Sequence, residues 1–220
     1  YFMAFVNDVL LSKTVNTLVE PESVTLAVLV NLFAISLFGL QHSVMARGSF
    51  KRWLTKVLHP TMERSTYVLA TAVAIAAMGY LWVPFGSVVW QVESETAVFI
   101  IRAVAVFGWA FLLLASFMLD HFELFGISQT FMPLRGKPMP TTRFKTPGFY
   151  KVVRHPIQTG VLIGMWAVPV ATTSHLFFAG GMTVYIVVGL YFEEKDLIRE
   201  FGQTYRDYML KVKRVIPFLF

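Results

Sequence analysis

Polar and titratable side chains gather in four short clusters, each at one end of a long apolar segment. The clusters are Gln41-His42-Ser43, Asp120-His121-Phe122-Glu123, Arg154-His155-Pro156 and Glu193-Glu194-Lys195-Asp196. Ionisable groups in membrane-spanning segments are costly and mark sites of binding or proton transfer. If the apolar segments are spanning helices, all four clusters lie at one face and can line a single cavity. The other interpretation is that they only mark where helices leave the membrane.

Two of the histidines, His42 and His121, are candidate proton acceptors. Each lies at the end of a long apolar run, and an imidazole titrates near neutral pH. Each could equally be a buried histidine whose ring bonds a backbone carbonyl. His59 and His175 are expected in loops and are given no role.

The segment before the fourth apolar run predicts an anion site. Arg154 and His155 precede Pro156, and proline is favoured at the first position of a helix. A helix N-terminus attracts anions, and Gly160, one turn later, would let a ligand approach the backbone closely. The alternative is a basic anchor that faces anionic lipid.

Glu193 and Glu194 close the last apolar run and could bind a cation or ribose hydroxyls. A ligand that carries a carboxylate, an ammonium group and a ribose would suit this acidic pair together with the basic pair Arg154 and His155. S-adenosylmethionine is such a ligand.

The composition predicts an all-α polytopic membrane protein. Of the 220 residues, 56% are hydrophobic and only 15% are charged, whereas a soluble domain carries about 25% charged residues. The apolar runs are continuous, unlike the alternating strands of a membrane barrel. With about 20 residues needed per span, we expect five spanning helices, at 24–45, 67–85, 96–119, 157–171 and 176–192.

The placement of lysine and arginine predicts the orientation. Basic residues are dense in 46–64, 135–154 and 195–214, and absent from 86–101 and 172–175. Five spans alternate with this pattern, which puts the N-terminus outside and the C-terminus in the cytoplasm. Residues 133–147, rich in proline, are expected to form a loop. Residues 2–19 are compatible with a helix that lies on the membrane surface.

Several classes of site are excluded. The chain has no cysteine, so disulfides, thiolate metal sites and cysteine nucleophiles are absent. No histidine pair has tight metal-ligand spacing, and no metal is expected. A Gly-x-Gly-x-x-Gly motif after a strand is also missing. The net charge of +6 is explained by the membrane, and no nucleic-acid partner is expected.

The C-terminal half carries Arg154-His155-Pro156 with Gly160, an apolar hairpin, Glu193-Glu194-Lys195-Asp196-Leu197 and Tyr205-Arg206-Asp207-Tyr208. This set resembles the isoprenylcysteine carboxyl methyltransferase superfamily of integral membrane methyltransferases.

The N-terminal half narrows the resemblance. It carries Gln41-His42-Ser43 with Arg47, Glu63-Arg64-Ser65 with Tyr67, and Asp120-His121-Phe122-Glu123-Leu124-Phe125-Gly126 followed by Gln129. The first two resemble the bacterial branch that contains methanethiol S-methyltransferases and NnrU-like proteins, and the third is most similar to the methanethiol S-methyltransferases. The resemblance covers roughly residues 30–220.

The resemblance implies a single domain over 1–220, with the substrate pocket mainly in 24–126 and the cofactor part mainly in 144–220. The implied cofactor is S-adenosylmethionine, the substrate methanethiol, the product dimethyl sulfide and the location a bacterial cytoplasmic membrane. The implied cofactor contacts are Tyr150, Arg154, His155, Gly160, Glu193 and Glu194, with Tyr205 and Tyr208 closing the pocket.

The chain departs from the family pattern at two positions. Gln158 stands where the family usually has an aromatic residue, so the contact made there is not carried over. Ser128 stands where a basic residue is expected.

The implied reaction is an in-line displacement, for which donor and acceptor must be held aligned. A thiolate is a better nucleophile than a thiol, so a base near the substrate would help. The candidates are His42, His121, Asp120 and Glu123. We favour His121, with Glu123 or Asp120 orienting its ring.

Two other functions stay open at this point. One is methylation of a larger lipidic thiol, carboxylate or amine. The other is a non-enzymatic NnrU-like membrane protein. A transporter is disfavoured, because the middle of each apolar run holds almost no charge and no inverted repeat is evident.

Overall fold

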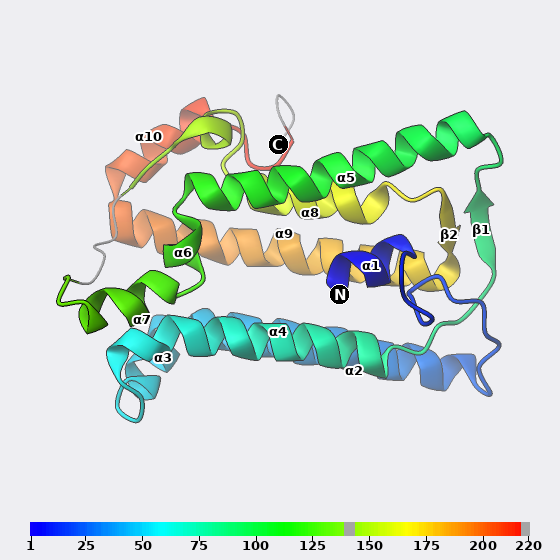
Figure 1. Ribbon diagram of the computed structural model, residues 1–220, viewed down its shortest axis with the longest axis horizontal. Helices are drawn as coiled ribbons and strands as arrows, with labels where there is room; N and C mark the ends of the chain where they lie inside the picture. The colour runs from blue at the N-terminus through cyan, green and yellow to red at the C-terminus, as the bar shows by residue number, and fades with distance from the viewer. Residues whose placement is uncertain (139–143, 217–220) are drawn as a thin grey trace.

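The protein is a bundle of long helices with shorter elements at both ends (Figure 1). The computed structural model describes residues 1–138 and 144–216. Within them, four helical segments are long and apolar enough to cross a membrane, so the predicted helical membrane protein is confirmed at this level. These segments are α2 (Val24–Ala46), α4 (Glu63–Leu81) with the preceding turn η1 (Pro60–Met62), α5 (Glu95–Met118) and α9 (Thr173–Phe201).

The predicted span at 157–171 is not a long helix. α8 (Pro156–Trp166) has 11 residues, about 16 Å at 1.5 Å per residue, roughly half the hydrocarbon thickness of a bilayer. Pro169 explains the early end, because a proline disfavours helical backbone at the residue before it, here Val168. Four helices thus have the length of a span, and the fourth of the five predicted spans is a short helix followed by extended chain. The count of five spans stays a prediction.

α5 and α8 approach each other closely through glycines. A Cβ on Gly160 would lie 2.6 Å from the Gly108 carbonyl oxygen and 2.7 Å from the Leu112 nitrogen, and one on Gly164 would overlap the Trp109 ring. Small residues at such a crossing let two backbones pack in contact. Helix packing thus accounts for Gly160 without the ligand that the sequence predicted there.

A second helix pair is formed by α2 and α4, and α9 lies between the two pairs (Figure 1). The fully buried Asn31 of α2 closes the end of α4. Its Nδ2 donates to the Val83 carbonyl and its Oδ1 accepts from the Val83 amide, both at 2.8 Å. A backbone group that would otherwise be orphaned in an apolar setting is satisfied in this way.

The start of the N-terminal segment packs against the bundle, and of the residues 2–19 that were compatible with a surface helix only Phe2–Asn7 are helical. α1 (Phe2–Asn7) buries Phe5 and Val6 against the core that includes Trp82 and Phe178. Asn7 Nδ2 donates to the Gly164 carbonyl at 2.8 Å. This hydrogen bond ties the N-terminal segment to the last turn of α8.

A two-stranded antiparallel sheet, which the sequence did not predict, lies at the end of the bundle where α8 ends and α9 begins. β1 (Val88–Gln91) pairs with β2 (Val170–Thr172). Asn16 bonds the same strand, because its Nδ2 donates to the Val170 carbonyl at 3.1 Å and its Oδ1 accepts from the Thr172 amide at 3.0 Å. The extended chain after α8 is therefore hydrogen-bonded from both sides.

The opposite end carries α3 (Gly48–Leu54), α6 (His121–Leu124), α7 (Ile127–Leu134), η2 (Gly148–Lys151) and α10 (Gln203–Lys211) (Figure 1). Arg64 Nε donates to the Leu124 carbonyl at 2.7 Å, and Ser65 Oγ donates to the Gly126 carbonyl at 3.0 Å. These bonds hold α6 and α7 against the start of α4. Of the predicted loop 133–147, Pro133 belongs to α7 and residues 139–143 lie outside the described residues.

Glycine substitutions test the α5–α8 contact. Gly160→Ala should destabilise the protein by about 1 to 3 kcal/mol, because the added methyl group overpacks the crossing. Gly180→Ala is the matched control in α9, where a Cβ meets nothing within 4 Å; it should be neutral or stabilising by up to about 1 kcal/mol. The measurement is thermal unfolding in detergent, followed by tryptophan fluorescence. Equal midpoints for the two variants would contradict the close packing.

Candidate active site

A buried carboxylate, that of Glu194 on α9, organises the charged end of the bundle. The residue is 3% exposed. Its Oε1 lies 2.8 Å from both Nε and Nη2 of Arg154 and 3.2 Å from Nε2 of His155. Its Oε2 accepts from Nη2 of Arg214 at 2.5 Å. A charge so deeply buried is tolerated only when it is paired and hydrogen-bonded, so these four side chains form one unit.

The start of α8 is also joined to the segment that follows α10. Arg154 N donates to the Lys213 carbonyl at 2.7 Å and His155 N to the Arg214 carbonyl at 3.0 Å. Thr159 Oγ1 donates to the Val215 carbonyl at 2.8 Å. The C-terminal segment is thus part of the wall of the site.

Glu193, the neighbour of Glu194, has a different environment. Its side chain is 48% exposed, and its Oε1 lies 3.7 Å from Nδ1 of His155. Successive residues on a helix point about 100° apart, so the pair divides into one buried and one accessible carboxylate. Of the two predicted ribose or cation ligands, Glu193 is the one with room for a ligand.

Aromatic side chains pack beside this charged group. Tyr208 donates its hydroxyl to the Tyr150 carbonyl at 2.5 Å. Tyr205 is 2% exposed, and its hydroxyl has no hydrogen-bond partner among the described residues. The Phe144 ring packs on both tyrosines, with centroids 5.9 Å and 5.4 Å away. A buried hydroxyl without a partner is unusual and is available to a bound molecule.

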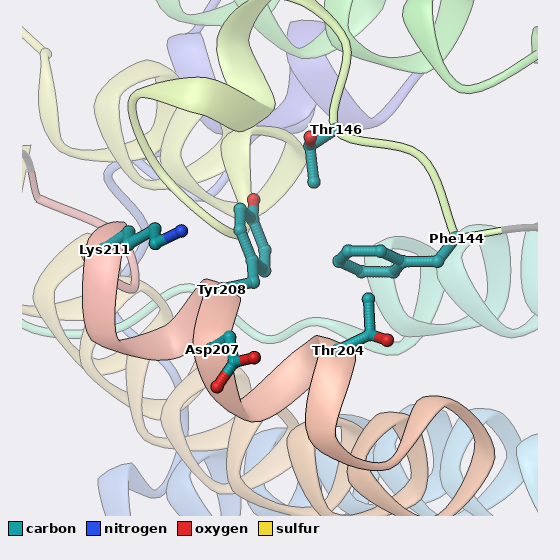
Figure 2. Close-up of a pocket in the computed structure, with 6 residues that line it drawn as sticks. All are labelled: Phe144, Thr146, Thr204, Asp207, Tyr208 and Lys211. Atoms are coloured by element: carbon teal, nitrogen blue, oxygen red, sulfur yellow. The ribbon is translucent and has the colours of Figure 1, made fainter.

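A cavity of about 360 Å³ opens next to Tyr208. Figure 2 shows Phe144 and Tyr208 at its sides and Thr146 between them, with the Lys211 amino group directed towards Tyr208. The lining residues are Phe144, Thr146, Thr204, Asp207, Tyr208 and Lys211. Tyr208 is the one predicted cofactor residue among them.

The phenols at this site stay protonated at neutral pH. Burial raises the pKa of Tyr208 to about 12, opposed by the nearby Arg154 guanidinium. Burial, followed by the charge of Glu193, raises the pKa of Tyr150. Burial, followed by the charge of Glu194, raises the pKa of Tyr205. Each phenol is therefore a hydrogen-bond donor here.

His42 belongs to a second polar group, between α2, α4 and α9. The Tyr67 hydroxyl lies 2.8 Å from its Nε2 and 3.0 Å from its Nδ1. Thr71 Oγ1 is 3.3 Å from Nδ1. The rings of Phe38 and Tyr185 flank the imidazole at 5.6 Å and 6.3 Å between centroids.

His121 lies in a different setting, and its predicted carboxylate partners do not orient it. Its Nδ1 is 2.8 Å from Ser116 Oγ, and its ring stacks on Phe117 at 4.2 Å. Within the described residues, neither Asp120 nor Glu123 hydrogen-bonds the ring. Asp120 is exposed with a left-handed backbone, φ 78°, which directs the chain into α6.

Several residues of the two polar groups are not predicted as site residues from the sequence. Arg214 and Lys211 lie in the basic C-terminal segment, Thr71 and Tyr185 lie in apolar runs, and Phe144 lies in the proline-rich segment. For Arg214 the sequence held one usable signal. A carboxylate that is buried among basic segments, such as that of Glu194, needs more than one cationic partner.

Substitution of Glu194 tests whether it organises this end. Glu194→Gln should destabilise the protein by about 3 kcal/mol, because two arginines lose their buried partner. Asp196→Asn is the matched control on the same helix. Its carboxylate pairs with Arg47 and Arg199 and is 47% exposed, so the loss should stay below about 1 kcal/mol. Thermal unfolding in detergent measures both, and similar losses would refute the assigned role.

Comparison with known proteins finds relatives along the whole chain. Methanethiol S-methyltransferase 2 of Bradyrhizobium diazoefficiens is 43% identical over 220 residues, covering 100% of this chain and 84% of the relative. Methanethiol S-methyltransferase of Mycobacterium tuberculosis is 42% identical over 217 residues, covering 99% and 88%. Nurim of Sus scrofa is more distant, at 26% identity over 186 residues, covering 81% and 71%.

No protein-family model matches the chain, and no solved structure is significantly similar to it. The close relatives, together with the motifs at His42, His121, Arg154 and Glu193, give one consistent assignment: this chain belongs to the methanethiol S-methyltransferase family.

Proposed function

We propose that this protein methylates methanethiol to dimethyl sulfide, with S-adenosylmethionine as the methyl donor. The carrying observation is 42 to 45% identity to relatives named methanethiol S-methyltransferase, over 88 to 100% of this chain. The structure supports it with a polar, partly accessible site at one end of an apolar bundle, which suits a volatile apolar thiol and a charged donor.

The side chains present fit S-adenosylmethionine. The half-exposed Glu193 can accept from ribose hydroxyls or an ammonium group, and the unpartnered Tyr205 hydroxyl can donate. Lys211 can pair with a carboxylate at the cavity of Figure 2, where the Phe144 ring offers an apolar face. Tyr150, Arg154, His155, Glu194 and Tyr208 complete the proposed binding region, and Gly160 supports it through the packing of α8.

S-adenosylmethionine supplies a methyl group on a positively charged sulfur, ready for displacement. The chain must hold the thiol in line with that group and keep water away. The apolar walls of α2, α4 and α5 keep water away from the thiol. This exclusion matters because a desolvated thiolate is more reactive. Proton removal falls to the imidazoles of this end, His42 and His121, with Asp120 and Glu123 as further candidates.

The placement in the membrane follows the distribution of basic residues. We place the polar end, with α3, α6, α7 and α10, in the cytoplasm and the β1–β2 end outside, in the cytoplasmic membrane of a bacterium. The substrate part lies mainly in 24–126 and the cofactor part mainly in 144–220. A cytoplasmic site gives direct access to S-adenosylmethionine, and a neutral sulfide can leave through the bilayer.

The direct test is headspace gas chromatography of the purified protein with S-adenosylmethionine and methanethiol. Dimethyl sulfide should accumulate above a no-protein control and in proportion to protein. If no product forms but S-adenosylmethionine still binds in calorimetry, methanethiol is rejected as the substrate. The assignment as a methyltransferase, with another acceptor, is then retained. Absence of both would reject the enzyme.

A second test separates the two neighbouring glutamates. Glu193→Gln should weaken S-adenosylmethionine binding about 10- to 100-fold, the equivalent of one charged hydrogen bond of about 1.5 to 3 kcal/mol, and leave the unfolding temperature unchanged. Glu200→Gln, an exposed residue of the same helix, is the control and should bind normally. Calorimetry measures the affinity. Unchanged affinity in Glu193→Gln would remove this residue from the binding site.

A further inference from the structure

His42 is tied to α4 by two hydroxyls whose roles can be assigned. Thr71 Oγ1 donates to the Tyr67 carbonyl at 2.9 Å, so its hydrogen is already used and its oxygen can only accept from His42. The Tyr67 oxygen also lies 3.0 Å from Nδ1. A tautomer that carries its proton on Nδ1 satisfies the 3.3 Å contact with Thr71. Nε2 is left as an acceptor, and the Tyr67 hydroxyl lies 2.8 Å from it.

The resulting order is Tyr67 O–H, His42 Nε2, His42 Nδ1–H and Thr71 Oγ1. This order is that of a general base with an orienting group. The phenol and the imidazole can carry the proton, and the threonine hydroxyl orients the imidazole. We call this series of three side chains the relay. Tyr67 is 7% exposed, so bulk water has little access to the phenol, whereas His42 is only half-buried. The Arg64 guanidinium lies over the Tyr67 ring, 5.2 Å from its centroid.

The relay also lies next to the proposed cofactor region. The carboxylate of Glu193 is within electrostatic range of Tyr67, Tyr185 and Tyr150. Glu193 in turn contacts His155 at 3.7 Å. The accessible carboxylate of Glu193 therefore lies between the α2–α4 polar group and the start of α8. A site for two substrates requires such neighbouring regions for the acceptor and the donor.

His121 has no comparable connection. Its contacts are Ser116 and the rings of Phe117, Phe122 and Phe125, all from its own stretch of chain. Those three phenyl rings are 52%, 54% and 39% exposed, so they belong to the outer surface of the bundle. The preference for His121 as base, drawn from the sequence, is not supported by this placement.

We propose that Tyr67 and His42 together remove the proton of the thiol substrate, with Thr71 as a positioning residue that sets the imidazole tautomer. This rests on the proposed methyl transfer. The thiol S–H bond breaks and its proton passes to the Tyr67 oxygen, while the Tyr67 proton passes to His42 Nε2. The thiolate sulfur bonds to the methyl carbon, whose bond to the donor sulfur breaks. The imidazolium then loses its proton to water.

The charged and titratable groups around His42 bear on any pH profile. From α4 these are Glu63, Arg64 and Tyr67, and from α9 they are Tyr185 and Glu193. Tyr67 belongs to the proposed relay itself, and the Glu193 carboxylate contacts His155 of the proposed cofactor region.

The test measures dimethyl sulfide formation against pH for five variants, at His42, Tyr67, Thr71, His121 and the control position His59. His42→Gln and Tyr67→Phe should lose about 100-fold or more in kcat near pH 7, the usual worth of a general base. Thr71→Val should lose about 10-fold. The exposed His59→Gln is the matched control and should behave as the wild type. The loss in the first two should shrink as the pH approaches the pKa of the thiol itself, because the thiolate then forms in solution.

The alkaline recovery separates chemistry from structure, since a merely misfolded variant loses activity at every pH. S-adenosylmethionine affinity, measured by calorimetry, should stay within about twofold of the wild type. The proposal is overturned if His42→Gln and Tyr67→Phe keep wild-type kcat, or if their losses do not diminish at alkaline pH. It is also overturned if His121→Gln shows the alkaline-rescued loss in their place. A wild type that makes no dimethyl sulfide would refute the proposed function itself.

Discussion

The carboxylate of Glu194 is the interaction on which the rest of the polar end depends. A single buried anion receives hydrogen bonds from Arg154, His155 and Arg214. Glu194 lies on α9, and its partners come from the start of α8 and from the segment after α10, so the ion pairs join three separate parts of the chain. Desolvating such a group is expensive unless its geometry is complete, so the three parts adopt their positions together. Tyr150 and Tyr208 then have a defined wall to pack on.

The two polar groups of the bundle come from different helices. α2 and α4 carry the imidazole, phenol and hydroxyl of His42, Tyr67 and Thr71, whereas the charged group is built from α9, from the residues just before α8 and from the segment after α10. α9 lies between the two helix pairs and contributes to both groups, through Tyr185 in one and Glu193 beside the other.

Residue types and their positions along the chain were enough to predict the helical class, the four polar clusters and the family. They were not enough where two neighbours differ only in direction. Glu193 and Glu194 are indistinguishable as letters, and the 100° between them on α9 decides which one is buried. His42 and His121 both end apolar runs, yet one faces α4 and α9 and the other faces exposed phenyl rings. Pro169 could have predicted the early end of α8, because proline disfavours helical backbone at the residue before it. The continuous apolar run through 157–171 favoured a longer helix instead.

The short α8 has a consequence for how the protein enters the membrane. Its 11 residues reach only about half of the apolar thickness, so this segment is a poor candidate for independent insertion. The extended chain that follows it takes hydrogen bonds from Asn16 and from β1, so its backbone groups are satisfied where the helix has already ended. Assembly of α8 and β2 is therefore coupled to the N-terminal segment and to β1, two parts of the chain that lie far away in the sequence.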